Sequence, residues 1–208
     1  MADAVLERTH ACIEAYYSGK IARFGATPLG VDWTCVATQN LRFVQLLRVC
    51  EGDAFSLNDF GCGYGALLDF CRERHPRWAL DYLGIDLSAR MVEAARSKWA
   101  DEPAARFHVG ATSPRCADVC IASGVFNVCQ DIPRAEWEAF IRDTLREMRR
   151  TCSSGFSANF LAPGGREIPQ LYRTAPGPWV DFCEQELGGR VRLIEGYGLR
   201  EFTLLASR

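Results

Sequence analysis

Short β-type runs alternate with amphipathic helical stretches along most of this chain, and this alternation limits the folds that it can adopt. A helix between two runs is long enough to carry the chain back across a sheet, so successive strands point the same way. The pattern predicts a mostly parallel sheet with helices on both faces. In order, the expected elements are strand 56–60, helix 65–75, strand 80–86, helix 88–99, strands 105–109 and 117–123, helix 133–150, strand 154–161 and a helical region that ends near residue 187.

Two parts of the chain depart from the alternation. Residues 191–208 form two β runs around a glycine-containing turn, and so short a connection allows only an antiparallel pair. Residues 110–116 leave too little chain for a crossover helix, so one turn or an irregular loop is expected there. The predicted fold class is α/β, with a doubly wound, seven-stranded, mostly parallel sheet and a terminal antiparallel hairpin.

The N-terminal part of the chain precedes the alternating region. Residues 3–20 place two tyrosines and three other apolar residues on one face of a helix. A link rich in glycine and proline at 25–30 leads to a second helical stretch at 36–49. We expect residues 1–34 to form a helical lid over a domain that spans residues 35–208.

Composition and charge exclude several classes of protein. The 208 residues include 48 % apolar and 24 % charged ones, as in an ordinary globular domain. The net charge is −2 with no basic stripe, so no nucleic-acid partner is expected. No apolar run reaches the length of about 18 residues that a membrane helix needs, and we expect neither a signal peptide nor a membrane partner.

The cysteines also bear on the cellular setting. Ten cysteines contain no Cys-x-x-Cys pair, so we expect free thiols in a reducing cytoplasm and no metal site. Either a monomer or a homodimer is compatible with these features.

The strongest local signal is the stretch Asp-Phe-Gly-Cys-Gly-Tyr-Gly at residues 59–65, between a predicted strand and a predicted helix. Glycines let the backbone turn sharply and let a ligand lie against it without meeting a Cβ atom. The helix that follows offers unpaired N–H groups to a polar ligand. By itself the signal is ambiguous, because Gly61, Gly63 and Ala66 also match the dinucleotide-binding pattern Gly-x-Gly-x-x-Gly/Ala.

Asp86 supplies the context for this glycine loop. It ends the next predicted strand, where an acid can hold the hydroxyl groups of a ribose. The dinucleotide-binding pattern also has an acid at this place. Two further features favour a different family: Asp59, two residues before the first glycine, and the terminal hairpin. With these features, residues 35–208 resemble the class I S-adenosylmethionine-dependent methyltransferases, whose seventh strand is inserted antiparallel. The motifs specify the cofactor but not the acceptor.

The resemblance implies S-adenosyl-L-methionine as the cofactor, with Asp86 on the ribose hydroxyls and Leu87 against the adenine. The family often has an acid after the third strand; here that contact falls to backbone or to Thr112. Arg42 would bind the methionine carboxylate through its bidentate geometry, or it forms a surface salt bridge instead. The loop residues expected to line the cofactor are Asp59, Gly61, Cys62, Gly63, Gly65 and Ser123.

The acceptor is expected beyond the fourth strand and under the lid, where the family places the donor methyl group. Aromatic residues in these places also serve as core anchors, and Asn127 could be an ordinary loop or cap residue. The candidate pocket residues are Tyr17, Trp33, Phe126, Asn127, Asn159 and Tyr172.

No catalytic base stands out, and the candidates are Asn127, Tyr16 and His10. Methyl transfer from a sulfonium is an in-line displacement, so alignment alone can supply much of the rate. We therefore expect methyl transfer to a small molecule. Two alternatives stay open: cyclisation or elimination of the same cofactor, and a nicotinamide- or flavin-dependent oxidoreductase, for which the chain leaves no second catalytic domain.

Overall fold

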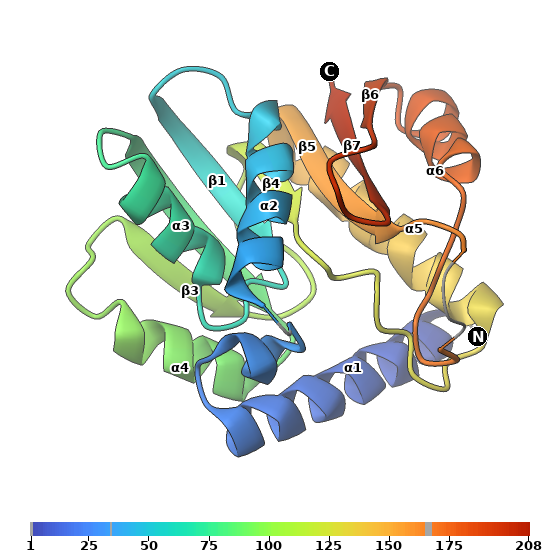
Figure 1. The fold of residues 1–208 in the computed structure, drawn as a ribbon, viewed down its shortest axis with the longest axis horizontal. Helices are drawn as coiled ribbons and strands as arrows, with labels where there is room; N and C mark the ends of the chain where they lie inside the picture. The colour runs from blue at the N-terminus through green and yellow to red at the C-terminus, as the bar shows by residue number, and fades with distance from the viewer. Residues whose placement is uncertain (1, 34, 165–167) are drawn as a thin grey trace.

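A computed structural model describes residues 2–33, 35–164 and 168–208, and Figure 1 shows one twisted sheet covered by helices on both faces. The predicted boundary at residue 34 lies outside the described residues. The strands are β1 Ala54–Phe60, β2 Ala79–Asp86, β3 Ala105–Val109, β4 Ala117–Ala122, β5 Cys152–Leu161, β6 Arg190–Ile194 and β7 Glu201–Ser207. The helices are α1 Ala2–Phe24, α2 Val36–Leu46, α3 Ala66–Arg74, α4 Ala89–Lys98, α5 Arg134–Thr151 and α6 Gly177–Asp181, with short turns η1 Pro28–Val31, η2 Leu47–Val49 and η3 Phe182–Glu186.

The predicted sheet is confirmed. Its seven strands lie in the order β3-β2-β1-β4-β5-β7-β6. The pairs β1–β2, β2–β3, β1–β4 and β4–β5 are parallel, whereas β7 runs antiparallel to both β5 and β6. Because β7 is reversed, its first residue, Glu201, pairs with the last residue of β5, Leu161. The terminal hairpin therefore begins its final strand at the carboxyl edge of the parallel strands.

Each face of the sheet carries its own apolar core. The large inner side chains of α5 pack on one face with α6, as the spacing of Trp137, Phe140, Ile141, Leu145 and Met148 predicts. On the other face, side chains of α2, α3 and α4 pack against β1 and β2. None of the described helices is long and apolar enough to cross a membrane.

The N-terminal helix α1 lies along the edge of the sheet where the parallel strands end, at the bottom of Figure 1. It contacts α4 at one end and α5 at the other, so it bridges the two faces. The helix is longer than predicted and ends before Gly25, whose φ of +66° suits a residue without a Cβ. α1 therefore sits over the edge at which parallel α/β sheets bind ligands.

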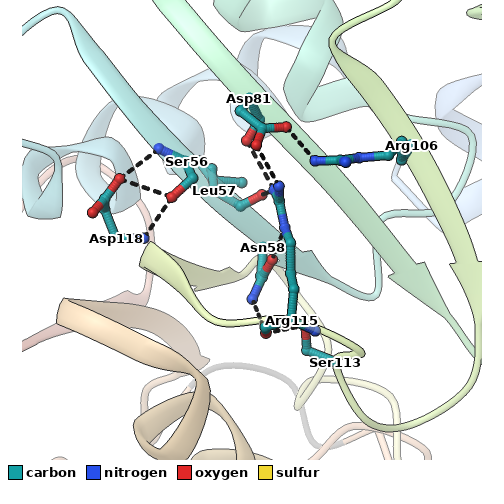
Figure 2. Close-up of polar contacts among 8 residues, drawn as sticks. All are labelled: Ser56, Leu57, Asn58, Asp81, Arg106, Ser113, Arg115 and Asp118. Carbon is teal, nitrogen blue, oxygen red and sulfur yellow. Dashed lines mark hydrogen bonds and ion pairs between the residues drawn. The ribbon is translucent and has the colours of Figure 1, made fainter.

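The connection between β3 and β4 contains no helix, as expected. Arg115 in this loop binds polar groups of β1 and β2 that a crossover helix would otherwise cover. Its guanidinium donates to the carbonyls of Leu57 and Asp81 at 3.1 and 2.9 Å, to Asn58 Oδ1 at 3.0 Å and to the Asp81 carboxylate at 2.6 Å (Figure 2). The loop is anchored again where Ser113 N–H donates to Glu147 on α5. The polar side chains on this part of the sheet thus have partners although no helix covers them.

We predict that Arg115→Ala lowers the free energy of unfolding by about 2–3 kcal/mol, because a half-buried side chain with several charge-assisted bonds is lost. Urea unfolding would measure this. Arg106→Ala is the matched control: Arg106 pairs with the same carboxylate, but its side chain is 59 % exposed, so its removal should cost ~1 kcal/mol at most. Equal losses in both variants would show that Arg115 is only one more surface ion pair.

Candidate active site

A cleft of about 950 Å³, measured out to its open mouth, lies at the carboxyl edge of the sheet. Its floor comes from the residues that end or follow β1, β2, β3 and β4, which a parallel sheet brings to one edge. Its outer wall comes from α1, the segment after η1, α2 and α5. The cleft is therefore built from both predicted parts of the chain.

The glycine loop after β1 forms one side of the cleft with bare backbone. Gly61 and Gly63 have φ values of +69° and +55°, which side-chain-bearing residues rarely adopt. A Cβ on Gly63 would lie 2.7 Å from a methyl group of Val31, so the loop and the η1 segment approach each other closely. The N–H groups of Gly61 and Cys62 both donate to the carbonyl of Ile85, at 2.8 and 3.1 Å. These bonds fix the loop on the end of β2.

Asp86 stands opposite this loop with its carboxylate oriented by backbone. One oxygen accepts from Gly63 N–H and the other from Ser88 N–H, each at 2.9 Å. A carboxylate can accept about four hydrogen bonds, so each oxygen keeps capacity for a ligand. Burial raises the pKa of Asp86 to about 6, although the two backbone donors lower it.

Asp59 is a second buried carboxylate that lines the cleft, and it is 2 % exposed. It accepts a hydrogen bond of 2.6 Å from the hydroxyl of Tyr82. Burial raises the pKa of Asp59 to about 7, the tyrosine hydroxyl lowers it, and the charge of Asp86 raises it again. The loop side of the cleft thus concentrates acidic groups that resist ionisation.

The loops after β3 and β4 supply further polar positions. Gly110 and Ala111 line the cleft, whereas Thr112 is exposed. The hydroxyl of Ser123 is buried and has no hydrogen-bond partner among the described residues. A buried hydroxyl without a partner is costly, so Ser123 is suited to a polar group of a ligand.

The outer part of the cleft is mostly apolar and aromatic. Tyr17 reaches the cleft from α1, and burial raises the pKa of its hydroxyl well above the ordinary range, so it stays protonated. The lining on this side consists of Ile13, Tyr17, Val31, Trp33, Gln39, Phe43, Val125, Phe140 and Thr144.

Comparison with known proteins now bears on this arrangement. A family model described as a methyltransferase domain matches residues 58–155. A protein of Mycobacterium tuberculosis, named "Putative methyltransferase Rv1506c", is 39 % identical over 163 residues, which are 77 % of this chain and 97 % of that protein. The chain belongs to the methyltransferase family.

Solved structures share the fold of this methyltransferase at low sequence identity. The pyocyanin biosynthetic protein PhzM matches with a TM-score of 0.68 and 15 % identity over 92 % of this chain, which spans 61 % of PhzM. The magnesium protoporphyrin IX methyltransferase ChlM from Synechocystis PCC 6803, solved with bound SAH, matches with a TM-score of 0.65 and 15 % identity over 95 % of this chain and 99 % of that one.

Many of the predicted cofactor residues meet in the cleft. Asp59, Gly61, Cys62, Gly63, Asp86, Leu87 and Ser123 all line it. Gly65 is instead the N-cap of α3, with φ +85°, and packs beneath the ring of Trp99. Thr112 points to solvent, so the neighbouring Gly110 and Ala111 take its place in the lining.

Arg42 requires a correction, because its guanidinium is already bound inside the protein. Its Nε and one terminal nitrogen donate to the carboxylate of Glu201, and its other terminal nitrogen donates to the carbonyl of Thr38 at 2.9 Å. Arg42 is 7 % exposed and is not among the residues that line the cleft. The spacing of residues gave no hint of this partner, which lies 159 positions away in the chain.

Among the predicted acceptor residues, Tyr17 and Trp33 line the cleft and the other four do not. Phe126 is fully buried between Phe140 and Phe160. The hydroxyl of Tyr172 donates to Glu138 at 2.9 Å, away from the cleft. Both side chains belong to the core and not to the cleft. The sequence could not distinguish the two, because periodicity shows which residues point inward but not which of them border a ligand.

The remaining two candidates are buried and do not line the cleft. Asn159 is fully buried, and its side chain bonds the backbone N–H of Gly124 at 2.7 Å. Asn127 is 3 % exposed, and neither atom of its amide has a partner among the described residues.

Nor do the three catalytic candidates reach the cleft. The hydroxyl of Tyr16 donates to Asp32 at 2.6 Å, and Lys20 binds the same carboxylate. His10 packs edge-on against Phe140, and burial lowers its pKa below the ordinary value. Tyr17, one residue beyond Tyr16, is the tyrosine that lines the cleft, because neighbouring helical residues point about 100° apart.

Sequence reasoning missed several residues of the lining. Gln39 and Phe43 come from α2 and Met91 comes from α4, and the pattern singled out none of these three side chains as a ligand contact. Phe140 was expected on the inner face of α5, and the cleft reaches that face. The only available signal was that all of them belong to helices next to the carboxyl edge.

We predict that the buried acid Asp59 makes stability fall as the pH rises from about 4 to about 7. An unfolded aspartate has a pKa near 3.9, whereas burial holds that of Asp59 near 7, so the folded protein keeps a proton that the unfolded chain has released. Asp59→Asn should reduce the fall by up to about 4 kcal/mol, measured by urea unfolding at pH 4.5 and 8. Asp118→Asn is the control of opposite sign, because Ser56 lowers the pKa of Asp118. An unchanged pH dependence in Asp59→Asn would contradict the assignment.

Proposed function

We propose that this methyltransferase transfers the methyl group of S-adenosylmethionine to a small, uncharged and largely apolar acceptor bound between α1, α5 and the loop after β4. The observation that carries the proposal is the position of α1. This helix places Ile13 and Tyr17 over the carboxyl edge of the sheet and so encloses the outer part of the cleft.

The residues of the loop side fit the cofactor. The glycine loop borders the cleft with backbone, where Gly61 and Gly63 leave room for the side chains of Val125 and Val31, and Asp86 has acceptor capacity for two ribose hydroxyls. Ser123 offers a buried hydroxyl that needs a partner, and Leu87 offers an apolar contact to a base. When bound, S-adenosylmethionine would supply an electrophilic methyl group on a positive sulfonium, and that charge would favour the ionised forms of Asp59 and Asp86, whose pKa values burial raises.

The outer side of the cleft limits what the acceptor can be. Among the described lining residues there is no lysine, arginine or histidine, so nothing there compensates an anionic acceptor. Trp33, Phe43 and Phe140 present apolar surface, and the protonated hydroxyl of Tyr17 can donate one hydrogen bond. An uncharged molecule with an apolar body and an acceptor atom suits this lining.

The names of two structural relatives agree with a small acceptor. One names a protein of pyocyanin biosynthesis and the other a methyltransferase of magnesium protoporphyrin IX. These descriptions belong to those proteins, and they support a small-molecule acceptor for this chain only together with its enclosed cleft.

The chain itself contributes alignment and exclusion of water rather than proton transfer. Reactants held in line gain much of their rate from orientation, and an acceptor that is nucleophilic at neutral pH needs no base. The apolar wall removes water from the reacting atoms, which strengthens the charge interactions of the site. Tyr17 would orient the acceptor through its donor hydrogen.

Calorimetry of the purified protein with S-adenosylmethionine, S-adenosylhomocysteine and NAD tests the cofactor. The first two should bind and NAD should not. Asp86→Asn should weaken binding about 10- to 100-fold, since hydrogen bonds to a charged group are worth ~1.5–3 kcal/mol. The exposed acid Asp101, changed to asparagine, should have no effect. Binding of NAD alone, or normal affinity in Asp86→Asn, would contradict the proposal.

A lid role for α1 predicts a change in amide hydrogen exchange. S-adenosylhomocysteine should slow exchange in residues 5–33, because closure over a ligand stabilises the contacts of α1 with α4 and α5. Tyr16→Phe removes the hydrogen bond to Asp32 and should raise exchange in α1 of the free protein. If α1 is as protected without ligand as with it, the helix is a fixed part of the core and the argument for a small acceptor loses its main support.

A further inference from the structure

Glu201, the first residue of β7, lies at the centre of a buried polar network next to the cleft. Its carboxylate accepts from Arg42 on α2 and from the side-chain amide of Asn159 on β5, the latter at 3.0 Å. Glu201 is 5 % exposed, so both charges of the ion pair are shielded from water. The antiparallel direction of β7 brings this acid to the carboxyl edge, where the cleft lies.

One branch of the network runs from Glu201 through Arg42 to Trp33. The guanidinium carbon of Arg42 lies 4.0 Å from the centre of the Trp33 ring, in cation–π contact. Trp33 lines the cleft, so a guanidinium held on one side by Glu201 supports the ring on the other.

The other branch runs from Glu201 through Asn159 to the loop after β4. A carboxylate only accepts hydrogen bonds, so the amide nitrogen of Asn159 must face Glu201 and its oxygen must face away. That oxygen accepts the N–H of Gly124 at 2.7 Å. The charge on Glu201 therefore sets the orientation of the amide and, through it, the position of a cleft-lining loop.

The two branches meet in the cleft wall. Gly124 has φ +75°, and a Cβ there would collide with the ring of Trp33, so ring and glycine are in direct contact. Buried ion pairs often add little to stability, because desolvation offsets their attraction. This ion pair orients groups in the cleft wall through hydrogen bonds and a cation–π contact. An apolar pair of the same volume could fill the space but could not orient them.

We propose that Glu201 is a positioning residue of the methyltransferase: through Arg42 and Asn159 it holds Trp33 and Gly124 in the arrangement that forms the cleft wall. The inference rests on the proposed function for its ligand, since the wall is taken to border the cofactor and the acceptor. The position of Trp33 can be measured without either.

Fluorine-19 NMR of protein labelled with 5-fluorotryptophan tests the network directly. The five tryptophans give separate lines, and Trp33→Phe identifies the line of Trp33. In Glu201→Gln this line should broaden or split, because the carboxamide can donate as well as accept and no longer imposes one orientation on Asn159. Affinity for S-adenosylhomocysteine, measured by calorimetry, should fall at least fivefold. Glu102→Gln, which weakens the half-buried pair with Arg72 away from the cleft, should change neither readout.

The apolar double variant Arg42→Met/Glu201→Leu separates positioning from stability. It should melt a few degrees below the wild-type temperature, because no unpaired charge is left buried but the amide nitrogen of Asn159 loses its acceptor. It should still show a broadened Trp33 line and weak ligand binding, and it serves alone if Glu201→Gln does not fold. A single sharp Trp33 line with affinity within twofold of wild type, in either variant, would overturn the proposal. Wild-type protein that fails to bind S-adenosylhomocysteine would instead overturn the proposed function, while the NMR result would still judge the network.

Discussion

The carboxylate of Asp86 joins the glycine loop after β1 to the start of α4, since it accepts from the backbone of both Gly63 and Ser88. A loop of glycines has no side chains to pack, so its shape depends on such hydrogen bonds and on those of Gly61 and Cys62 to Ile85. Burial beside this loop raises the pKa of Asp86 and Asp59. The two buried acids at the cleft therefore lower the stability of the fold at neutral pH.

Segments from both ends of the chain contribute to the cleft and its surroundings. The ends of the parallel strands supply the floor of the cleft with its buried acids, and α1 adds Ile13 and Tyr17 to its outer wall. Because β7 runs antiparallel to β5, its first residue, Glu201, lies at the edge at which β5 ends. Arg42 and Trp33, which precede the sheet in the chain, are held by a residue of the last strand.

The opposite part of the sheet shows how a missing helix is tolerated. The loop between β3 and β4 covers little surface, and the strands beneath it carry polar residues such as Asn58 and Asp81 (Figure 2). Arg115 satisfies these groups with one planar side chain. Because its donors reach two strands at once, the loop holds the sheet through hydrogen bonds where the other connections use apolar packing.

The sequence by itself determined the elements and the edge at which the cleft lies: alternation predicted the parallel strands, the short glycine turn predicted the reversed β7, and the loop at 59–65 with Asp86 pointed to the carboxyl edge that borders the cleft. These signals are local, because strand and helix periodicity and glycine conformations depend on neighbouring residues. The tertiary structure alone decided which inward-facing side chain meets which partner. Arg42 is bound by Glu201 and does not reach the cleft. The side chain of Phe126 is buried in the core, and Tyr17 rather than Tyr16 lines the cleft. Such choices depend on contacts between residues far apart in the chain, and no spacing along the sequence encodes them.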